Sequence, residues 1–188
     1  MIAVCAVLAG LVVGRAAGGS LGRVSRLRLR GEVAILVTFV LQGIARGRIV
    51  GTSATTWGLV VWLAASITLV CLLGLNGTMP GVAIAAGGTL LNSVVVLANG
   101  AMPVLPAVGT HIDPLMVATM SGGFYSVAQA GTLGVWAGDV LPLRVLEHTY
   151  LLSAGDVLLA TGVAVLIAAS TLGQVDEIDH REDAGSNQ

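Results

Sequence analysis

The chain has 188 residues, of which 55% are hydrophobic and 10% charged, and its mean hydropathy is +0.92. Soluble globular domains carry about 25% charged residues, so this composition is typical of a membrane protein. The nine basic residues are all arginine and nearly balance the ten acidic ones. The absence of lysine excludes Schiff-base and P-loop mechanisms, and the balanced charge gives no basic surface for binding nucleic acid.

A helix needs about 17 to 25 predominantly apolar residues to cross the roughly 30 Å hydrocarbon core of a bilayer. Stretches of this kind predict transmembrane helices at about residues 2–14, 33–45, 58–75, 81–98 and 157–172. The predicted fold class is therefore all-α: a polytopic helical membrane protein with about five transmembrane helices. Residues 1–173 form its single helical membrane domain.

The first loop predicts the orientation of the chain. Five arginines lie between Arg15 and Arg30, and short arginine-rich loops face the cytoplasm. The N-terminus is then outside and the C-terminus cytoplasmic. Arg181 lies on the inner side with the five loop arginines, and Arg46, Arg48 and Arg144 lie outside. Residues 174–188 are acidic and lack an apolar period, so we expect a disordered cytoplasmic tail.

Residues 100–153 form a predicted outer loop that is too long for a simple linker. Within it, residues 115–136 have the length of a span, but glycines and polar side chains interrupt the apolar pattern. We expect this part to be interfacial or re-entrant. The alternative is a sixth span, which would place the tail outside.

The pattern N-G-x-M-P occurs twice, at Asn76–Pro80 and Asn99–Pro103. The interval corresponds to about 34 Å of helix, so the two copies bracket the predicted fourth span. Asn-Gly tolerates the left-handed conformation that ends a helix, and a following proline can open the next one. The two copies are either matched helix stops or polar gates formed by Asn76 and Asn99 at the ends of a path.

Asn92 lies in the middle of the same span, close to Gly87 and Gly88. An amide at this depth needs a partner, so Asn92 either hydrogen-bonds a neighbouring helix or contacts a solute or proton path. The glycines would allow a close approach of that helix. Gly10 and Gly14 form a GxxxG motif, which predicts a packing face on the first span.

Two carboxylates lie near the predicted last span. Asp156 follows Ser153 with the spacing of a capping box and is expected to stabilise the start of a helix. Asp139 lies in the outer loop, where it either pairs with Arg144 or carries protons. His111 and His148 could join Asp139 in an outer-face enzyme site, but no motif supports a metal or catalytic centre.

The order of these landmarks resembles a family of small bacterial integral membrane proteins catalogued as a domain of unknown function. The resemblance is carried by the arginine loop, the N-G-x-M-P copies, Asn92, and Ser153-Ala-Gly-Asp-Val-Leu158, and it covers most of residues 1–173. It implies a membrane protein of bacterial origin, located in the inner (cytoplasmic) membrane. It implies no activity, since the family has none established.

We therefore expect a non-enzymatic protein that either passes a small solute or is an accessory subunit of a membrane complex. The candidate residues for a substrate path are Asn76, Asn92, Asn99, Asp139 and Asp156. No cofactor or metal is expected. The expected partners are the lipid bilayer and either a second copy of the chain or a larger membrane complex. The alternative is a membrane-embedded enzyme with its site around Asp139, His111 and His148.

Overall fold

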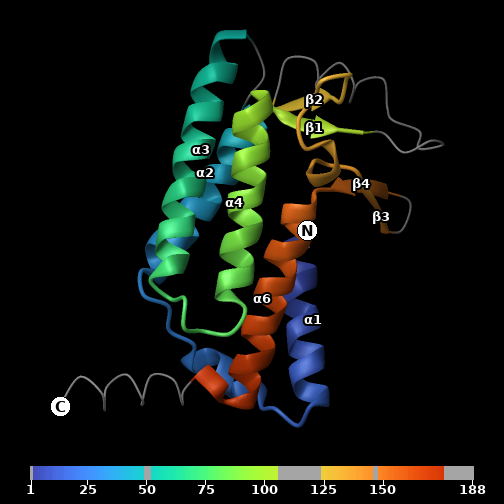
Figure 1. Ribbon diagram of the computed structural model, residues 1–188. Coiled ribbons are helices and arrows are strands. Elements are labelled where there is room, and N and C mark those ends of the chain that lie inside the picture. Colours follow the sequence, from blue (N-terminus) through green and yellow to red (C-terminus); the bar gives the residue numbers. More distant parts are fainter. Residues whose placement is uncertain (1, 49–51, 106–123, 146–147, 176–188) are drawn as a thin grey trace.

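The computed structural model describes residues 2–48, 52–105, 124–145 and 148–175, and these parts of the chain are mostly helical (Figure 1). The long helices are α1 (Ile2–Ala16), α2 (Glu32–Arg48), α3 (Thr52–Gly74), α4 (Val82–Asn99) and α6 (Ala154–Leu172). Two 3₁₀ helices, η1 (Leu21–Arg26) and η2 (Val135–Ala137), lie in the connections. Each apolar stretch that predicted a helix thus forms one, although all five helices extend beyond a predicted end.

Three of the described helices are long and apolar enough to cross a membrane. Their spanning windows are Trp57–Gly74, Val82–Asn99 and Ala154–Leu172. The first helix and the apolar part of the second, Glu32–Ala45, are shorter. Since a helix rises 1.5 Å per residue, α1 extends only about 22 Å. Length and composition therefore support three of the five predicted spans.

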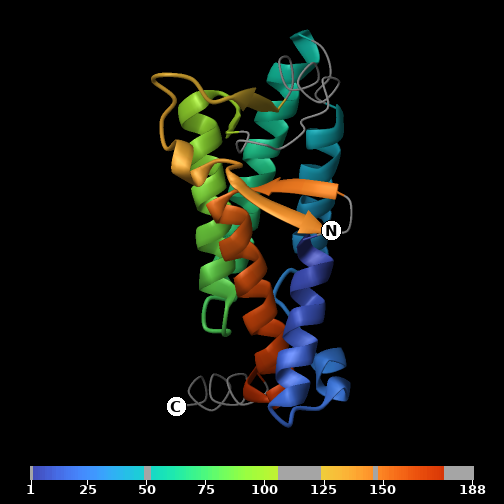
Figure 2. The same ribbon diagram turned by 90° about the vertical axis from the view of Figure 1, so that its right-hand side faces the viewer.

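The helices pack in the order α1, α6, α4, α3, α2, as Figures 1 and 2 show from two sides. The central pair, α4 and α6, is antiparallel, because Gly88 lies against Gly155 whereas Gly81 lies against Gly162. The first turn of α6 lies beside Asn92, more than halfway along α4. As a result, α6 extends beyond the N-terminal end of α4.

The predicted packing face of the first helix is confirmed. A Cβ atom at Gly10 would lie 2.9 Å from the Cβ of Ile167, and one at Gly14 would lie 3.1 Å from the Cα of Ala168. The first distance is too short for a real Cβ atom and the second is tighter than most, and a Cβ at Gly14 would also collide with the side chain of Thr171, so glycine at these positions lets α1 and α6 come this close. The two helices run parallel, since both contacts advance in the same direction.

The prediction of an all-α fold was wrong for the outer loop. β1 (Met102–Val104) pairs in parallel with β2 (Tyr125–Val127), and β3 (Leu141–Val145) pairs antiparallel with β4 (His148–Leu152). Such pairing satisfies backbone amides that a loop beside a membrane would otherwise leave without partners. Of the proposed sixth span, residues 124–136 contain β2 and η2 rather than a long helix. The rest, residues 115–123, lies outside the described residues.

The first sheet is attached to the helices through a hydrophobic cluster. Trp62 of α3 and Phe124 meet edge to face with ring centroids 4.8 Å apart. Met102 and Val96 are fully buried in the same cluster. This anchor holds the start of the outer loop, at Met102, and its middle, at Phe124 and Ala137, against α3 and the last turns of α4.

Candidate functional site

The centre of the candidate site is a hydrogen-bonded group that joins α4 to α6. Asn92 donates from Nδ2 to Oδ1 of Asp156 across 2.9 Å. The hydroxyl of Ser153 donates to Oδ1 of Asn92 across 2.8 Å. Asn92 and Ser153 are both buried. This geometry agrees with the prediction that Asn92 hydrogen-bonds a neighbouring helix, which is α6.

The same serine caps the helix. Ser153 has extended backbone angles, and its Oγ accepts from the backbone N–H of Asp156 at 2.9 Å, as an N-cap residue does. The carboxylate of Asp156 lies in the first turn, where a negative charge is favoured by the helix dipole. The predicted cap is thus seen, but the Asp156 carboxylate also turns toward α4 to meet Asn92.

Two glycines make this contact possible. A Cβ atom at Gly155 would collide with the side chain of Asn92 and with the carbonyl oxygen of Gly88. A Cβ atom at Gly88 would collide in turn with the backbone of Gly155 and Leu159. Gly87, by contrast, has open space where its Cβ would be. Of the two glycines predicted to admit a close helix, only Gly88 does so.

A cavity of about 140 Å³ reaches this group. All five long helices contribute to its wall: Ile2, Phe39, Gln42, Gly43, Trp62, Thr89, Asn92, Asp156 and Leu159. Its polar lining comes from Gln42, Thr89, Asn92 and Asp156, on three different helices. Gln42 is oriented by a hydrogen bond from its Nε2 to Oγ of Ser66, 3.0 Å away. A carboxylate, two amides and a hydroxyl therefore meet in a cavity between apolar helices.

Gln42 and Ser66 were not recognised from the sequence. Each lies in an apolar run, at Ala34–Gly43 and Trp62–Leu73, that contains one other polar residue, Thr38 or Thr68. Such a residue has no motif around it and is as easily explained by packing. The signal that could have identified them is the presence of polar residues within separate apolar helices, namely Gln42, Ser66 and Asn92.

The structure does not bring Asn76 and Asn99 to the cavity. Asn76 lies in the turn between α3 and α4, where Oδ1 accepts from the Arg30 N–H at 2.7 Å. Asn99 ends α4 at its other end, donating to the carbonyl oxygens of Val95 and Leu133. Both amides thus hold backbone segments together. Asn92 is the one asparagine of these three that lines the cavity.

The two N-G-x-M-P copies do lie at opposite ends of α4, as predicted. Gly100 adopts the left-handed conformation that ends the helix, with a φ of 70°. The first copy differs, because the left-handed residue there is Gly81 rather than Gly77. The proline of the second copy, Pro103, does not open a helix as predicted, because it lies in β1.

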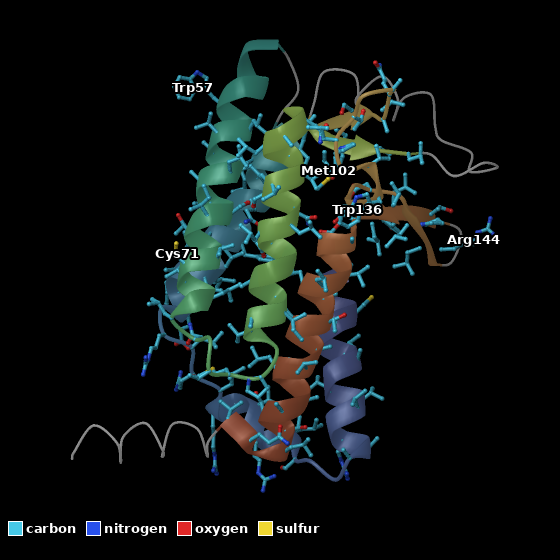
Figure 3. All side chains as sticks on the ribbon, in the orientation of Figure 1. Trp57, Cys71, Met102, Trp136 and Arg144 are labelled. Carbon is cyan, nitrogen blue, oxygen red and sulfur yellow. The ribbon has the colours of Figure 1, made fainter. Side chains whose placement is uncertain are left out.

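Asp139 is buried at 6% exposure and lies beside the first sheet. Its N–H donates to the carbonyl oxygen of Pro103 at 2.8 Å. Arg144 is exposed on the β3–β4 hairpin, away from the helices (Figure 3). The pairing of Asp139 with Arg144 remains a prediction.

The candidate residues of the enzyme alternative are only partly described. His111 lies outside the described residues, and His148 is described by its backbone alone, at the start of β4. Within the described parts of the chain, no group of three or more His, Cys, Asp or Glu side chains could hold a metal ion. A site formed by Asp139, His111 and His148 remains a prediction.

The fold and the cavity define a class: a small helical protein with three helices that could cross a membrane and a polar cavity between its helices. The chain belongs to a family of unknown function, DUF5317, whose model matches residues 26–168. This match covers α2, α3, α4, the outer segment and most of α6. Searches of curated proteins and of solved structures found no match.

Proposed function

We propose that this chain is an integral protein of the bacterial inner membrane that binds a small polar solute between its helices and passes it across the bilayer. The observation that carries the proposal is the cavity lined by Gln42, Thr89, Asn92 and Asp156. Polar side chains within a membrane are costly and often mark solute or ion paths. Here they converge from three helices on one cavity.

The exposed side chains support the location. Large apolar residues are exposed along the helices, among them Val12 at 67%, Val33 at 71% and Leu97 at 71%. Water would disfavour so much exposed apolar surface, whereas lipid tails accept it. Trp57 and Trp136, both exposed, lie on the half of the molecule away from the arginine loop, where they could meet headgroups (Figure 3).

The length of α1 supports an estimate of how deep in the bilayer the cavity lies. Ile2 lines the cavity, and Arg15 lies in the last turn of the same helix. The thirteen residue steps from Ile2 to Arg15 correspond to about 20 Å. With Arg15 at the headgroups, the cavity lies roughly two-thirds of the way across a 30 Å hydrocarbon core. We place the arginine loop and the C-terminus in the cytoplasm, with the N-terminal end of α1 directed toward the outside, following the arginine distribution.

The lining indicates the class of solute. Asp156 carries the only formal charge among the described residues around the cavity. Carboxylate and amide oxygens accept hydrogen bonds, so the cavity suits a small cation or a neutral solute rich in N–H or O–H donors. Because liquid water occupies about 30 Å³ per molecule, a space of this size holds about four to five waters or one small solute.

Transport can be tested with purified protein in liposomes. The probes are protons, reported by an entrapped pH dye, sodium ions, reported by an entrapped sodium dye, and urea, reported by isosmotic swelling. We expect at least one probe to enter faster than in protein-free liposomes. Asn92→Leu and Asp156→Asn should each slow that entry at least tenfold.

Thr161→Val is the matched control, because Thr161 is an exposed polar residue of α6 whose hydroxyl bonds its own helix at Val157. This variant should transport at the wild-type rate. Failure of all three probes to enter faster than in empty liposomes, with folded protein present, would overturn the transport proposal and favour an accessory subunit. Equal rates in Asn92→Leu and Thr161→Val would show that the solute does not pass this cavity.

A further inference from the structure

A second cavity, of about 240 Å³, lies at the end of the molecule that carries the arginine loop. It is formed where this loop meets the turn between α3 and α4. Arg28, Arg30 and Thr78 provide its polar wall, and Leu75 and Met79 provide apolar surface. None of these residues contributes to the cavity between the helices.

The shape of this second cavity is fixed by Asn76. Its amide accepts from the backbone N–H of Arg30 at 2.7 Å and donates to the Arg30 carbonyl oxygen at 3.1 Å. A further bond from the same amide to Leu72 O ties it to α3. Asn76 is only 2% exposed. The loop that carries the two guanidinium groups is therefore held in place before any ligand arrives.

The loop that forms one side of this cavity is positively charged. Five arginines lie between residues 15 and 30, against a single carboxylate, Glu32, up to the end of α2. Figure 3 shows nitrogen-tipped side chains gathered at this end of the molecule. Glu32 pairs with Arg28 at 3.6 Å, but both side chains are at least half exposed, and such pairs are weak. An anion can therefore compete for Arg28.

An apolar stripe leads away from the same cavity along α3. Leu75 is 58% exposed and Ile67 is 60% exposed, and Cys71 between them is exposed as well. Ile67 and Cys71 are four apart on one face of α3, and Leu75 follows four positions later, just past the end of the helix, with its N–H bonded to the Cys71 carbonyl oxygen. Cys71 points outward from the lower part of α3 in Figure 3. A ligand with a phosphate at the arginines and an apolar chain along this stripe would contact both surfaces.

We propose that this second cavity binds the phosphate headgroup of an anionic phospholipid in the leaflet facing the arginine loop. Guanidinium groups bind phosphate through paired, charge-assisted hydrogen bonds, and the Thr78 hydroxyl adds a donor. The acyl chain follows the stripe that begins at Leu75. This inference rests on the membrane location proposed above, but it is independent of solute transport. Free inorganic phosphate would bind the arginines but has no acyl chain to contact the stripe.

The test measures the melting temperature of the detergent-solubilised full chain with added phosphatidylglycerol, phosphatidylcholine or inorganic phosphate. We expect phosphatidylglycerol to raise the melting temperature more than phosphatidylcholine, and inorganic phosphate to have little effect. The double variant Arg28→Gln/Arg30→Gln should lose the preference for phosphatidylglycerol. Arg26→Gln is the matched control, since Arg26 is exposed, lies in the same loop and does not line the cavity.

Glu32→Gln removes the carboxylate that competes for Arg28 and should enlarge the preference for phosphatidylglycerol. If the double variant does not fold, Arg28→Gln alone replaces it. The Arg28 side chain is 77% exposed, so this variant should fold and should still lose part of the preference for phosphatidylglycerol. The proposal is overturned if Arg26→Gln loses as much preference as the cavity variants, or if inorganic phosphate reproduces the whole shift. A chain that stays soluble without detergent would instead contradict the membrane location. Arg28→Gln should transport solute at the normal rate, which would show that lipid binding at the second cavity is independent of the solute path.

Discussion

Asn92 and Asp156 are 64 positions apart in the sequence, yet their side chains share a hydrogen bond of 2.9 Å between α4 and α6. The bond forms at the level where α6 begins, beside the cavity between the helices. The two residues therefore have two roles in this account: they join the helices, and they present polar atoms to a solute. The predictions below separate these roles.

The structural role predicts coupling between the two side chains. Asn92→Leu and Asp156→Ala should each lower the free energy of unfolding in detergent by about 1 kcal/mol, the usual scale for a bond between membrane helices. Because Asn92→Leu removes the donor and Asp156→Ala the acceptor of the same bond, the double variant should lose less than the sum of the two. Strictly additive losses would mean that the bond does not contribute to stability.

The close approach of α4 and α6 predicts opposite effects for two adjacent glycines. Gly88→Ala should lower the melting temperature, because the new Cβ would collide with the backbone of α6. Gly87→Ala should leave it unchanged or raise it slightly, since its Cβ enters open space and alanine favours a helix by up to about 1 kcal/mol. Thermal unfolding of both variants in one detergent provides the comparison, and equal effects would contradict this packing.

The distribution of arginines predicts the topology. With six arginines inside and three outside, a cytoplasm-active reporter fused after Gln188 should be active and a periplasm-active reporter silent. The reverse result would contradict the orientation or the number of spans. A reporter inserted near Ala107 distinguishes these faults, because that position should lie outside with either five or six spans.

The choice of a non-enzymatic role predicts that the histidines are dispensable. His111→Ala and His148→Ala should change neither the melting temperature nor transport. If the buried carboxylate of Asp139 pairs with Arg144 as predicted, Asp139→Asn should lower the melting temperature, because it removes one partner of that pair. Stoichiometric bound metal in the purified protein, lost when both histidines are replaced, would instead support the enzyme alternative.

The sequence was informative where a feature depends on neighbouring residues. The helices follow from apolar runs of sufficient length, and the cap at Ser153 follows from the residue three positions later. The strands were missed because segments of three to five residues, such as β1 and β3, carry too little pattern to distinguish them from loop. Pro103 and Pro142 within these strands weakened the signal further.

The candidate site was predictable only in part. Asn92 and Asp156 could be named as candidates, since each stands out within an apolar segment. Their contact with each other, and the contribution of Gln42, depend on how α2, α4 and α6 pack. That packing places residues from distant parts of the chain around one cavity, and no local pattern records it.

The central claim is that a water-filled cavity exists between helices within the bilayer, and thiol labelling in native membrane vesicles tests it most directly. Starting from the variant Cys5→Ser/Cys71→Ser, cysteine is introduced by Thr89→Cys in the cavity or by Leu90→Cys on the outer face of α4. A small cationic methanethiosulfonate reagent reacts with thiols that water reaches.

The account predicts labelling of the Thr89→Cys protein and none of the Leu90→Cys protein, because position 90 faces lipid. Leu90 is 51% exposed and Thr89 only 5% exposed when lipid is disregarded. The opposite pattern, with labelling at position 90 and none at position 89, would contradict both the bilayer location and the solute path.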